Sequence, residues 1–322
     1  MSLPLTLRLA LCSALAALAP AAHAAGYPER PITLLVPFAA GSATDQLARA
    51  IGTAMSEQSA QVVIVDNKAG ASGMMAAQAA AKAPPDGYTV LITTNTTQAA
   101  NEHLYRKLPY DPVKDFAPVT GLGKGGQVLV VRADAPYRSV ADLIAKAKQQ
   151  PGKLSFGSGS SSSRVAGEMF KQLSHTDILH VPYKSNPQAV TDLLGGQIDL
   201  MITDTATGVP QVKSGKLRAL GYSMRTRSAQ LPEVPTLDEA GVKGYDMSYW
   251  FAAYVPAGTP RAVVDRLHEM LLKATRSAPA RAFYESSGCE AWTSSPEELA
   301  RFQRDEAQKW GRVIQAAGIE PE

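Results

Sequence analysis

The sequence is poor in cysteine, which excludes a fold held together by disulfides. Only two cysteines occur in 322 residues, Cys12 and Cys289. Cys12 lies in an N-terminal segment that we expect to be removed, so the mature chain keeps a single thiol and cannot form an intramolecular disulfide. An exported protein of this kind depends on its hydrophobic core for stability.

An excess of charge of one sign is also missing. The 32 Lys and Arg residues nearly balance 29 Asp and Glu residues, and the net charge is +3. Because the basic residues are scattered, we expect no nucleic-acid partner. A hydrophobic content of 45% and a charged content of 19% are typical of a globular chain. Its length fits two domains of ordinary size.

No apolar run is long enough to cross a membrane as a helix. The longest, at residues 9–18, falls short of the roughly 18 residues required. Arg8 precedes this run, and Ala22-His23-Ala24 has the small-x-small pattern that signal peptidase reads. We therefore predict a signal peptide over residues 1–24, with cleavage after Ala24 and export as a soluble protein. A lipid anchor on Cys12 is the alternative, which the bulky Leu11 before it disfavours.

Motifs of enzymes and metal sites are absent as well. Gly121, Gly123 and Gly126 have the G-x-G-x-x-G spacing but precede a β-rich run, so a phosphate-binding helix start is missing. No serine lies in a G-x-S-x-G elbow. The histidines lack metal-binding spacing, and none falls in the loops considered below. We expect no enzyme, metal or cofactor, and interpret four histidines as structural or surface residues: His103, His175, His180 and His268.

What the chain does contain is organised around a strand, a turn and a helix near its mature N-terminus. The apolar run from residue 32 ends at Pro37-Phe38, and helical spacing begins with Leu47 and Ile51. The turn between them exposes free backbone N–H groups at the positive end of a helix, which favours an anion. Gly41 allows the backbone to approach such a ligand closely.

The same order of elements occurs twice. Strands are expected near residues 32–38, 61–65 and 88–93, and again at 153–156, 178–181 and 198–203. Helices are expected between them, at 74–82, 165–173 and 187–194 among others. This βαβαβ order is typical of parallel sheets with helical crossovers. The sequence therefore predicts an α/β protein with two halves built alike.

Two extended runs, 127–132 and 249–255, belong to neither half and suit strands that cross between domains. We predict one domain from residues 25–126 plus 254–322 and a second from residues 127–253. Helices expected at 261–276, 280–286 and 296–317 then return to the first domain. A further helix at 139–149 begins with a capping box.

Ligands of open α/β sheets bind beyond the carboxyl ends of the strands. The loops there, at 40–45, 68–73 and 94–97 in one half and 158–163, 183–186 and 204–207 in the other, are mostly Gly, Ser, Thr and Asn. Such walls can hold a carboxylate without Arg or Lys. The predicted ligand-binding residues are Phe38, Ala40, Gly41, Ser42, Ala43, Thr44, Asp45, Thr94, Asn95, Ser158, Ser160, Ser161, Ser162, Ser163, Tyr183, Asp204 and Thr205.

Several of these residues have a second interpretation. Asp45 suits an N-terminal capping box as well as a pocket wall. Asp204 suits a turn as well as contact with a ligand ammonium or hydroxyl. The serine run at 158–163 also has the composition of a flexible linker. Three large side chains also have two interpretations. Tyr183 and Trp250 either line the cleft or lie in the core, and Arg164 either contacts the ligand or is solvated.

Motifs along the whole mature chain resemble one family. They are Pro37-Phe38 with Gly41 and Asp45, Asn67 with Gly70 and Gly73, Pro85-Asp86-Gly87-Tyr88-Thr89, Leu108-Pro109-Tyr110-Asp111-Pro112 with Lys114-Asp115-Phe116, His180-Val181-Pro182-Tyr183-Lys184, Asp192-Leu193-Leu194-Gly195-Gly196 and Pro256-Ala257-Gly258-Thr259-Pro260. Together they resemble the Bug family, the periplasmic substrate-binding proteins of tripartite tricarboxylate transporters. This chain departs from the family pattern at Ser42, where a second glycine is usual, in its serine-rich second turn, and at Lys68-Ala69, where Arg-Pro is frequent.

The resemblance implies a type II periplasmic-binding-protein fold, with two Rossmann-like α/β lobes joined by crossing strands. It also implies that the lobes close on a carboxylate, often through bridging waters, with the carboxylate-holding turns at 41–45 and 158–163. We expect a monomeric periplasmic receptor that delivers a dicarboxylate, an acidic amino acid or an aromatic acid to a tripartite membrane permease. Two alternatives remain open: a receptor that signals to a sensor kinase, and a secreted serine hydrolase.

Overall fold

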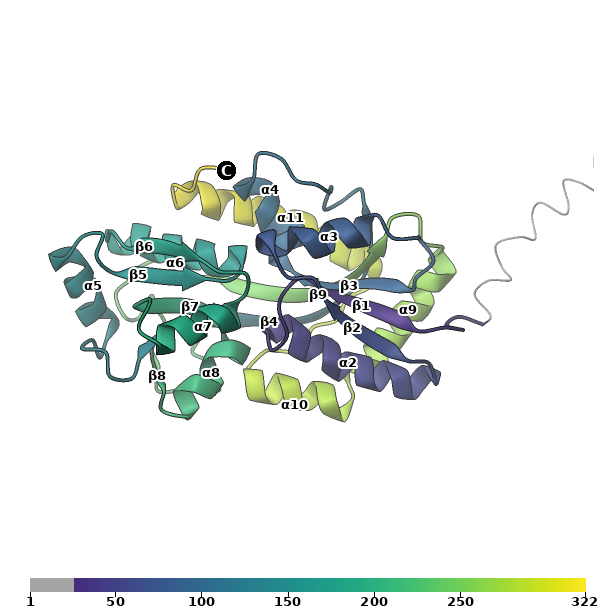
Figure 1. Ribbon diagram of the computed structural model, residues 1–322, viewed down its shortest axis with the longest axis horizontal. Coiled ribbons are helices and arrows are strands. Elements are labelled where there is room, and N and C mark those ends of the chain that lie inside the picture. The colour runs from purple at the N-terminus through teal and green to yellow at the C-terminus, as the bar shows by residue number, and fades with distance from the viewer. Residues whose placement is uncertain (1–25) are drawn as a thin grey trace, which may run out of the picture.

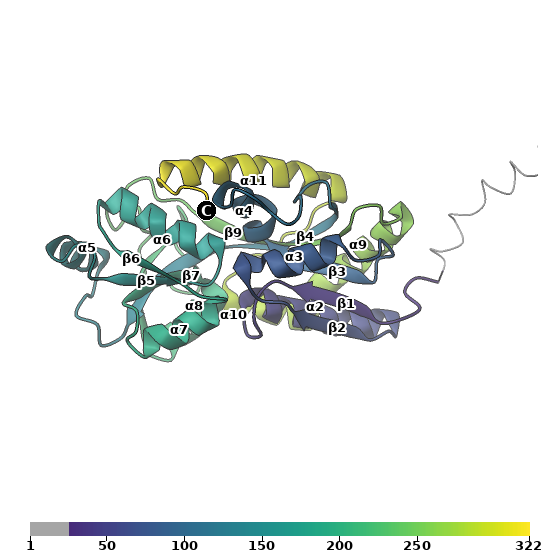
Figure 2. The same cartoon turned by 45° about the horizontal axis from the view of Figure 1, so that its top comes forward.

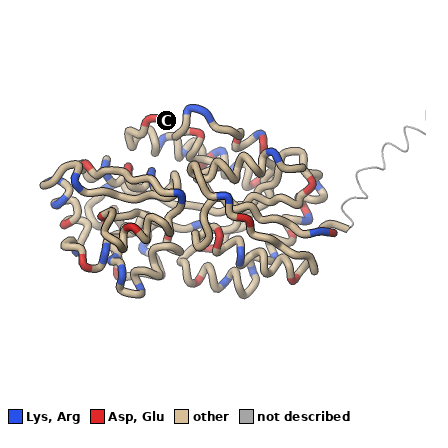
Figure 3. The backbone as a smooth tube through the Cα atoms, viewed as in Figure 1, with Lys and Arg blue, Asp and Glu red and all other residues tan. Residues whose placement is uncertain are grey.

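The computed structural model describes residues 26–322, so the predicted signal peptide lies outside the described residues. Two α/β lobes lie side by side, and α11 (Pro296–Ala316) runs along both (Figures 1 and 2). Basic and acidic residues are intermixed over both lobes (Figure 3), in keeping with the balanced charge. Among the described helices, none combines the length and apolar character needed to cross a membrane.

The first lobe contains a parallel sheet extended by two antiparallel strands. Its strand order is β2-β1-β3-β9-β4. The strands are β1 (Ile32–Val36), β2 (Val63–Asn67), β3 (Thr89–Thr94), β9 (Ser248–Pro256) and the first part of β4 (Phe116–Arg132). Its helical elements are α2 (Ala43–Ser59), η1 (Ala71–Gly73), α3 (Met74–Ala81), η2 (Thr96–Ala100), α4 (Asn101–Leu104), α9 (Arg261–Thr275) and α10 (Ala278–Ser287).

The second lobe repeats this plan. Its parallel strands follow the order β6-β5-β7, and the second part of β4 and then β8 extend them. The strands are β5 (Ser155–Ser158), β6 (Leu179–Pro182), β7 (Leu200–Asp204) and β8 (Leu217–Tyr222). The helices are α5 (Val140–Gln149), α6 (Ser161–Ser174), α7 (Asn186–Leu194) and α8 (Thr205–Lys213). The prediction of two similar α/β halves is confirmed.

Strand β4 joins the lobes. Residues 116–126 pair with β9, and residues 127–132 pair with β7 and β8. The expected extended run at 127–132 is therefore only the end of a longer strand. A Cβ at Gly121 would collide with the Trp292 ring, and one at Gly126 would collide with the Tyr222 ring. The glycines that mimic a phosphate-binding motif thus leave room for aromatic side chains.

The serine run is partly helical, which corrects the expectation of a loop over its whole length. Ser158 ends β5, and Ser161 to Ser163 form the first turn of α6. The helix begins early because the Ser160 hydroxyl accepts a hydrogen bond from the Ser163 N–H at 3.1 Å and so caps the helix. The flexible-linker interpretation is wrong. Several strands also begin one or two residues later than expected, β2, β5 and β7 among them.

The C-terminal helix covers the core as its apolar pattern predicts. Leu299 and Trp310 are buried, and Phe302 packs against the buried ring of Trp250 with centroids 5.4 Å apart. The Trp250 indole Nε1 donates to Glu306 Oε2 at 3.1 Å. Trp250 is therefore a core residue. The α11 helix contacts η2 and α4 of the first lobe and α6 of the second. The division of the chain into one domain of residues 25–126 plus 254–322 and another of residues 127–253 stays a prediction.

Candidate functional site

A narrow cavity lies where loops of both lobes meet. Its volume is about 40 Å³. One water needs at least about 10–15 Å³ of such a cavity, so the cavity holds only a few waters or a slender molecule. Its lining residues are Phe38, Ser42, Ala43, Thr44, Thr94, Asn95, Thr96, Gln127, Gly159, Ser160, Ser162, Asn186, Asp204, Tyr249 and Phe251. Both predicted turns thus reach one shared space.

Three helices begin at this cavity, each with a side-chain cap. Ser42 caps α2, and its hydroxyl accepts from the Asp45 N–H at 3.3 Å. Ser160 caps α6 of the opposite lobe. The Asp204 carboxylate caps α8 and accepts from the Thr207 N–H at 2.8 Å. Helix N-termini carry unsatisfied N–H groups and partial positive charge, so the starts of α2 and α6 favour an anion although no Lys, Arg or His lines the cavity. At the start of α8 the Asp204 carboxylate offsets this positive charge.

Two buried amides lining the cavity have unused hydrogen-bonding atoms. Asn95 is fully buried, and its Oδ1 accepts from the Trp250 N–H at 3.4 Å. Its Nδ2 has no hydrogen-bond partner among the described residues, and neither has Oε1 of Gln127. An unpaired buried donor costs about 1–3 kcal/mol. A ligand or water oxygen at Asn95 Nδ2 would remove that cost.

The remaining wall is aromatic. The rings of Tyr249 and Phe251 meet edge to face with centroids 5.2 Å apart, and Phe38 lines the cavity from the β1–α2 turn. The Thr205 hydroxyl lies 3.2 Å from the Tyr249 hydroxyl, so Thr205 stands behind the wall and does not line the cavity. These rings offer an apolar surface to a carbon chain between polar ends.

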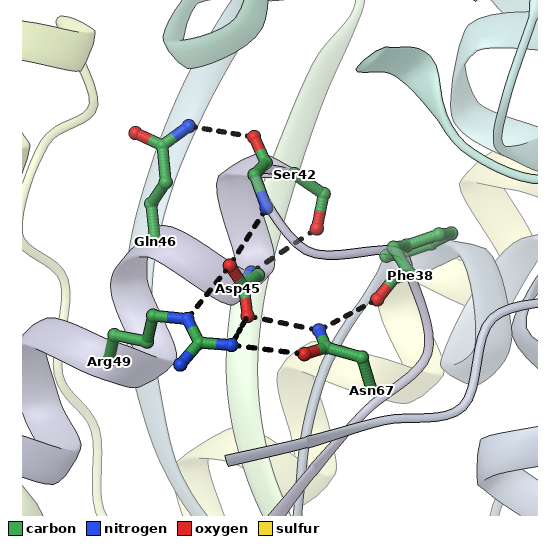
Figure 4. Close-up of polar contacts among 7 residues, drawn as sticks. Phe38, Ser42, Asp45, Gln46, Arg49 and Asn67 are labelled. Carbon is green, nitrogen blue, oxygen red and sulfur yellow. Dashed lines mark hydrogen bonds and ion pairs between the residues drawn. The ribbon is translucent and has the colours of Figure 1, made fainter. Parts of the chain in front are cut away.

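Asp45 does not line the cavity. Its carboxylate bonds instead to the first turn and to Asn67 of the neighbouring strand (Figure 4). Its Oδ2 accepts from the Gly41 N–H at 2.9 Å, and its Oδ1 accepts from Asn67 Nδ2 at 3.0 Å. Arg49 pairs with the same carboxylate at 3.0 Å. The expected capping box is incomplete, because the carboxylate bonds to Gly41 and not to the backbone of the cap residue Ser42. Asp45 therefore shapes the turn.

Other predicted residues also lie outside the cavity. Ala40 and Gly41 are exposed on the turn. Ser161 donates to Asn101 Oδ1 at 2.6 Å across the lobes, and Ser163 donates to the Ile202 carbonyl at 2.6 Å. Both hydroxyls are used in packing because α6 starts earlier than expected and turns these side chains away.

Ser158 and Tyr183 line a second, neighbouring cavity instead. There the Ser158 hydroxyl lies 2.7 Å from His180 Nε2, a contact that the sequence analysis missed when it placed no histidine near the loops. Burial, and then the charges of Arg164 and Lys171, lower the pKa of His180 to about 4. No carboxylate among residues 26–322 is hydrogen-bonded to this ring. The pair lacks the third group that orients the base in a catalytic triad.

Sequence reasoning missed part of the wall. The missed residues are Thr96, Gln127, Gly159, Asn186, Tyr249 and Phe251. Thr96, Gly159 and Asn186 lie in the loops predicted to hold the ligand, whereas Gln127 comes from β4 and Tyr249 and Phe251 come from β9. Those strands were recognised, but nothing in their sequence told which face would meet the cavity.

Residues 47–319 match the family model described as the tripartite tricarboxylate transporter family receptor. Among curated relatives, a UPF0065 protein from the tcbD-tcbE intergenic region of Pseudomonas sp. (strain P51) is 38% identical over 291 residues, which are 89% of this chain and 86% of the relative. Among solved structures, R. palustris Rpa4515 with adipate has a TM-score of 0.89 at 36% identity, covering 92% of this chain and 100% of the other. MatC from Rhodopseudomonas palustris with bound malate has a TM-score of 0.85 at 29% identity, with coverages of 89% and 100%.

Proposed function

Since the chain belongs to the tripartite tricarboxylate transporter receptor family, we propose that it binds a small carboxylate between its two lobes. Membership confirms the family that the motifs predicted. The members are solute-binding receptors and not enzymes, so the serine-hydrolase alternative is rejected. The proposal therefore concerns the identity of the ligand and the residues that bind it.

The observation that carries the proposal is the unpaired Nδ2 of Asn95 in a cavity onto which helix N-termini from both lobes converge. Both features are complementary to a carboxylate oxygen, and neither needs a positively charged side chain. Bound adipate and malate in the two similar structures support a carboxylate ligand.

Asp204 narrows the class of ligand. Its carboxylate lines the cavity, with Oδ2 accepting from Asn186 Nδ2 at 2.8 Å. A ligand carboxylate beside that of Asp204 would be repelled, unless the ligand also places a hydrogen-bond donor against Asp204. We therefore expect acids with a hydroxyl or ammonium group to bind more tightly than the unsubstituted acids. Gln127 Oε1, which is also unpaired among the described residues, is a further acceptor for such a donor.

Closure follows from the same contacts. A ligand that touches both lobes binds the closed form more tightly than the open form and so shifts the equilibrium toward closure. In the proposed cycle the closed monomer is recognised by a tripartite membrane permease in the periplasm, after export and cleavage following Ala24.

The test is thermal unfolding with a panel of dicarboxylates, hydroxy acids, acidic amino acids and aromatic acids. A ligand at 100 times its Kd stabilises the folded state by about 2.7 kcal/mol. Asn95→Asp keeps the shape of the side chain but places a carboxylate against the ligand, and we expect it to abolish the shift. Gln149→Ala, at an exposed position on α5, is the control and should leave the shift unchanged. No shift with any acid would refute the proposal.

A further inference from the structure

The second cavity, beside the first, has the composition of an anion site. Its volume is about 130 Å³. Most of its lining side chains are polar, and Ser160 lines both cavities. Its lining residues are Ser72, Tyr105, Ser158, Ser160, Arg164, His180, Pro182, Tyr183 and Glu322. The two cavities are therefore adjacent, with Ser160 in the wall of each.

Arg164 is the one residue carrying a positive charge in this lining at neutral pH. Its side chain, on the second turn of α6, is only 17% exposed. Its Nε is buried and has no hydrogen-bond partner among the described residues. His180 is neutral there because burial and Arg164 depress the pKa of its ring. The guanidinium therefore keeps an unused donor in a polar cavity next to the proposed ligand site.

A carboxylate of the chain itself already pairs with this guanidinium. Glu322 Oε1 lies 2.7 Å from a terminal nitrogen of Arg164. The backbone of Glu322 is bound to the first lobe, donating to the Leu104 carbonyl at 2.9 Å and accepting from the Arg106 N–H at 2.8 Å. The Glu322 side chain is 60% exposed, so the ion pair across the lobes is weak and its carboxylate is open to exchange.

We propose that Arg164 forms a second subsite, which takes the distal carboxylate of a linear dicarboxylate, and that Glu322 occupies this subsite until the ligand displaces it. The inference rests on the proposed function, since the first carboxylate of the same ligand lies in the first cavity. Glu322 is paired with a terminal nitrogen only. A ligand carboxylate that replaces Glu322 can pair with Nε and the terminal nitrogen beside it, and bidentate pairs with arginine are the stronger kind.

The experiment measures affinity by calorimetry for succinate, glutarate and adipate, each beside the monoacid of the same chain length: butyrate, pentanoate and hexanoate. For the unchanged protein we expect the diacids to bind more tightly. Arg164→Gln removes the positive charge and the paired N–H donors of the guanidinium. It should weaken the affinity for the diacid that the unchanged protein binds most tightly by at least about tenfold, and should change the affinity for the monoacid of the same length by no more than about twofold. Arg164→Lys restores the charge without the paired donors and should recover part of the loss.

The Glu322→Gln variant distinguishes a ligand subsite at Arg164 from an ion pair that only holds the two lobes together. If Glu322 stands in for the ligand, its neutral variant binds the diacids more tightly and the monoacids unchanged. Weaker binding of all acids by both Arg164→Gln and Glu322→Gln would mean that the ion pair only holds the lobes together, and would overturn the subsite. Equal affinity of diacids and monoacids for the unchanged protein would also overturn it, yet leave the proposed function intact. Binding of none of these acids would overturn the subsite too, and the wider acid panel would then decide the proposed function.

Discussion

The two turns that face each other across the first cavity begin their helices alike but are held in place differently. In both, a serine hydroxyl caps the helix, Ser42 on α2 and Ser160 on α6. Behind the first turn lies a charged cluster, in which Asp45 joins Gly41, Arg49 and Asn67. The second turn is held by a neutral contact instead, in which the Gly159 N–H donates to Asn186 Oδ1 at 2.9 Å.

The comparison separates what the ligand meets from what holds the turn. Toward the cavity both turns present free N–H groups and small side chains, so both are suited to an anion. Away from the cavity, the first turn depends on one buried carboxylate and the second on close packing. Substitutions in the two turns should therefore fail for different physical reasons.

The largest difference is expected between the two glycines. A Cβ at Gly159 would overlap the backbone of Ser185 and Asn186, whereas nothing lies within 4 Å of one at Gly41. Gly159→Ala should lower the free energy of unfolding by about 3 kcal/mol or more, because backbone cannot move aside as a side chain does. Gly41 has a φ of +81°, so Gly41→Ala should cost only about 1 kcal/mol of backbone strain. Urea unfolding of both variants checks this, and equal losses would contradict it.

Asp45→Ala should give the next largest effect. The Asp45 side chain is 3% exposed, and its loss leaves the Gly41 N–H and Asn67 Nδ2 without their acceptor. We expect the free energy of unfolding to fall by about 2–3 kcal/mol, together with weaker ligand binding from a loosened turn. Asp134→Ala is the control, because the Asp134 side chain is 78% exposed in its pair with Arg132. If both variants unfold alike in urea, the buried cluster does not hold the turn.

The two caps should be nearly equivalent in stability. Ser42→Ala and Ser160→Ala each remove one hydrogen bond at a helix start, which costs about 1 kcal/mol. Both also remove a hydroxyl from the lining of the cavity, so each should reduce affinity for the carboxylate. Thermal unfolding with and without the best ligand measures both quantities. A loss of affinity in only one variant would show that the ligand lies against a single lobe.

The smallest change at neutral pH is expected for His180→Gln, which keeps a nitrogen able to bond to Ser158. Burial lowers the pKa of His180 to about 4, below the ordinary value of 6.5. The folded state therefore binds fewer protons than the unfolded state. The stability from the neutral ring is fully present above pH 6.5 and is lost as the pH falls from there toward 4. The free energy of unfolding of His180→Gln should fall less over this range than that of the unchanged protein.

Much of the fold and part of the site could be predicted from the sequence because their signals are local. Apolar periodicity and glycine-rich breaks predict the repeated strands and helices, and the cap at Ser42 before α2 is among the correct predictions. The start of α6 is not, because this helix begins inside the serine run for which the sequence predicts a loop. The orientation of Asp45 could not be predicted, since it depends on Asn67 of the neighbouring strand. The contact between Ser158 and His180 likewise requires the register of β5 against β6.

The amino-acid sequence by itself determined that the protein consists of two similar α/β halves, each with a small, neutral turn before a helix. These features depend on hydrophobic period, helix caps and glycine, which act within a few residues. Only the tertiary structure decided which side chains share the cavity. Asn95 and Trp250, for example, meet across β3 and β9, and Arg164 meets Glu322, because side chains far apart in the chain are brought together only by strand pairing and by the packing of one lobe against the other.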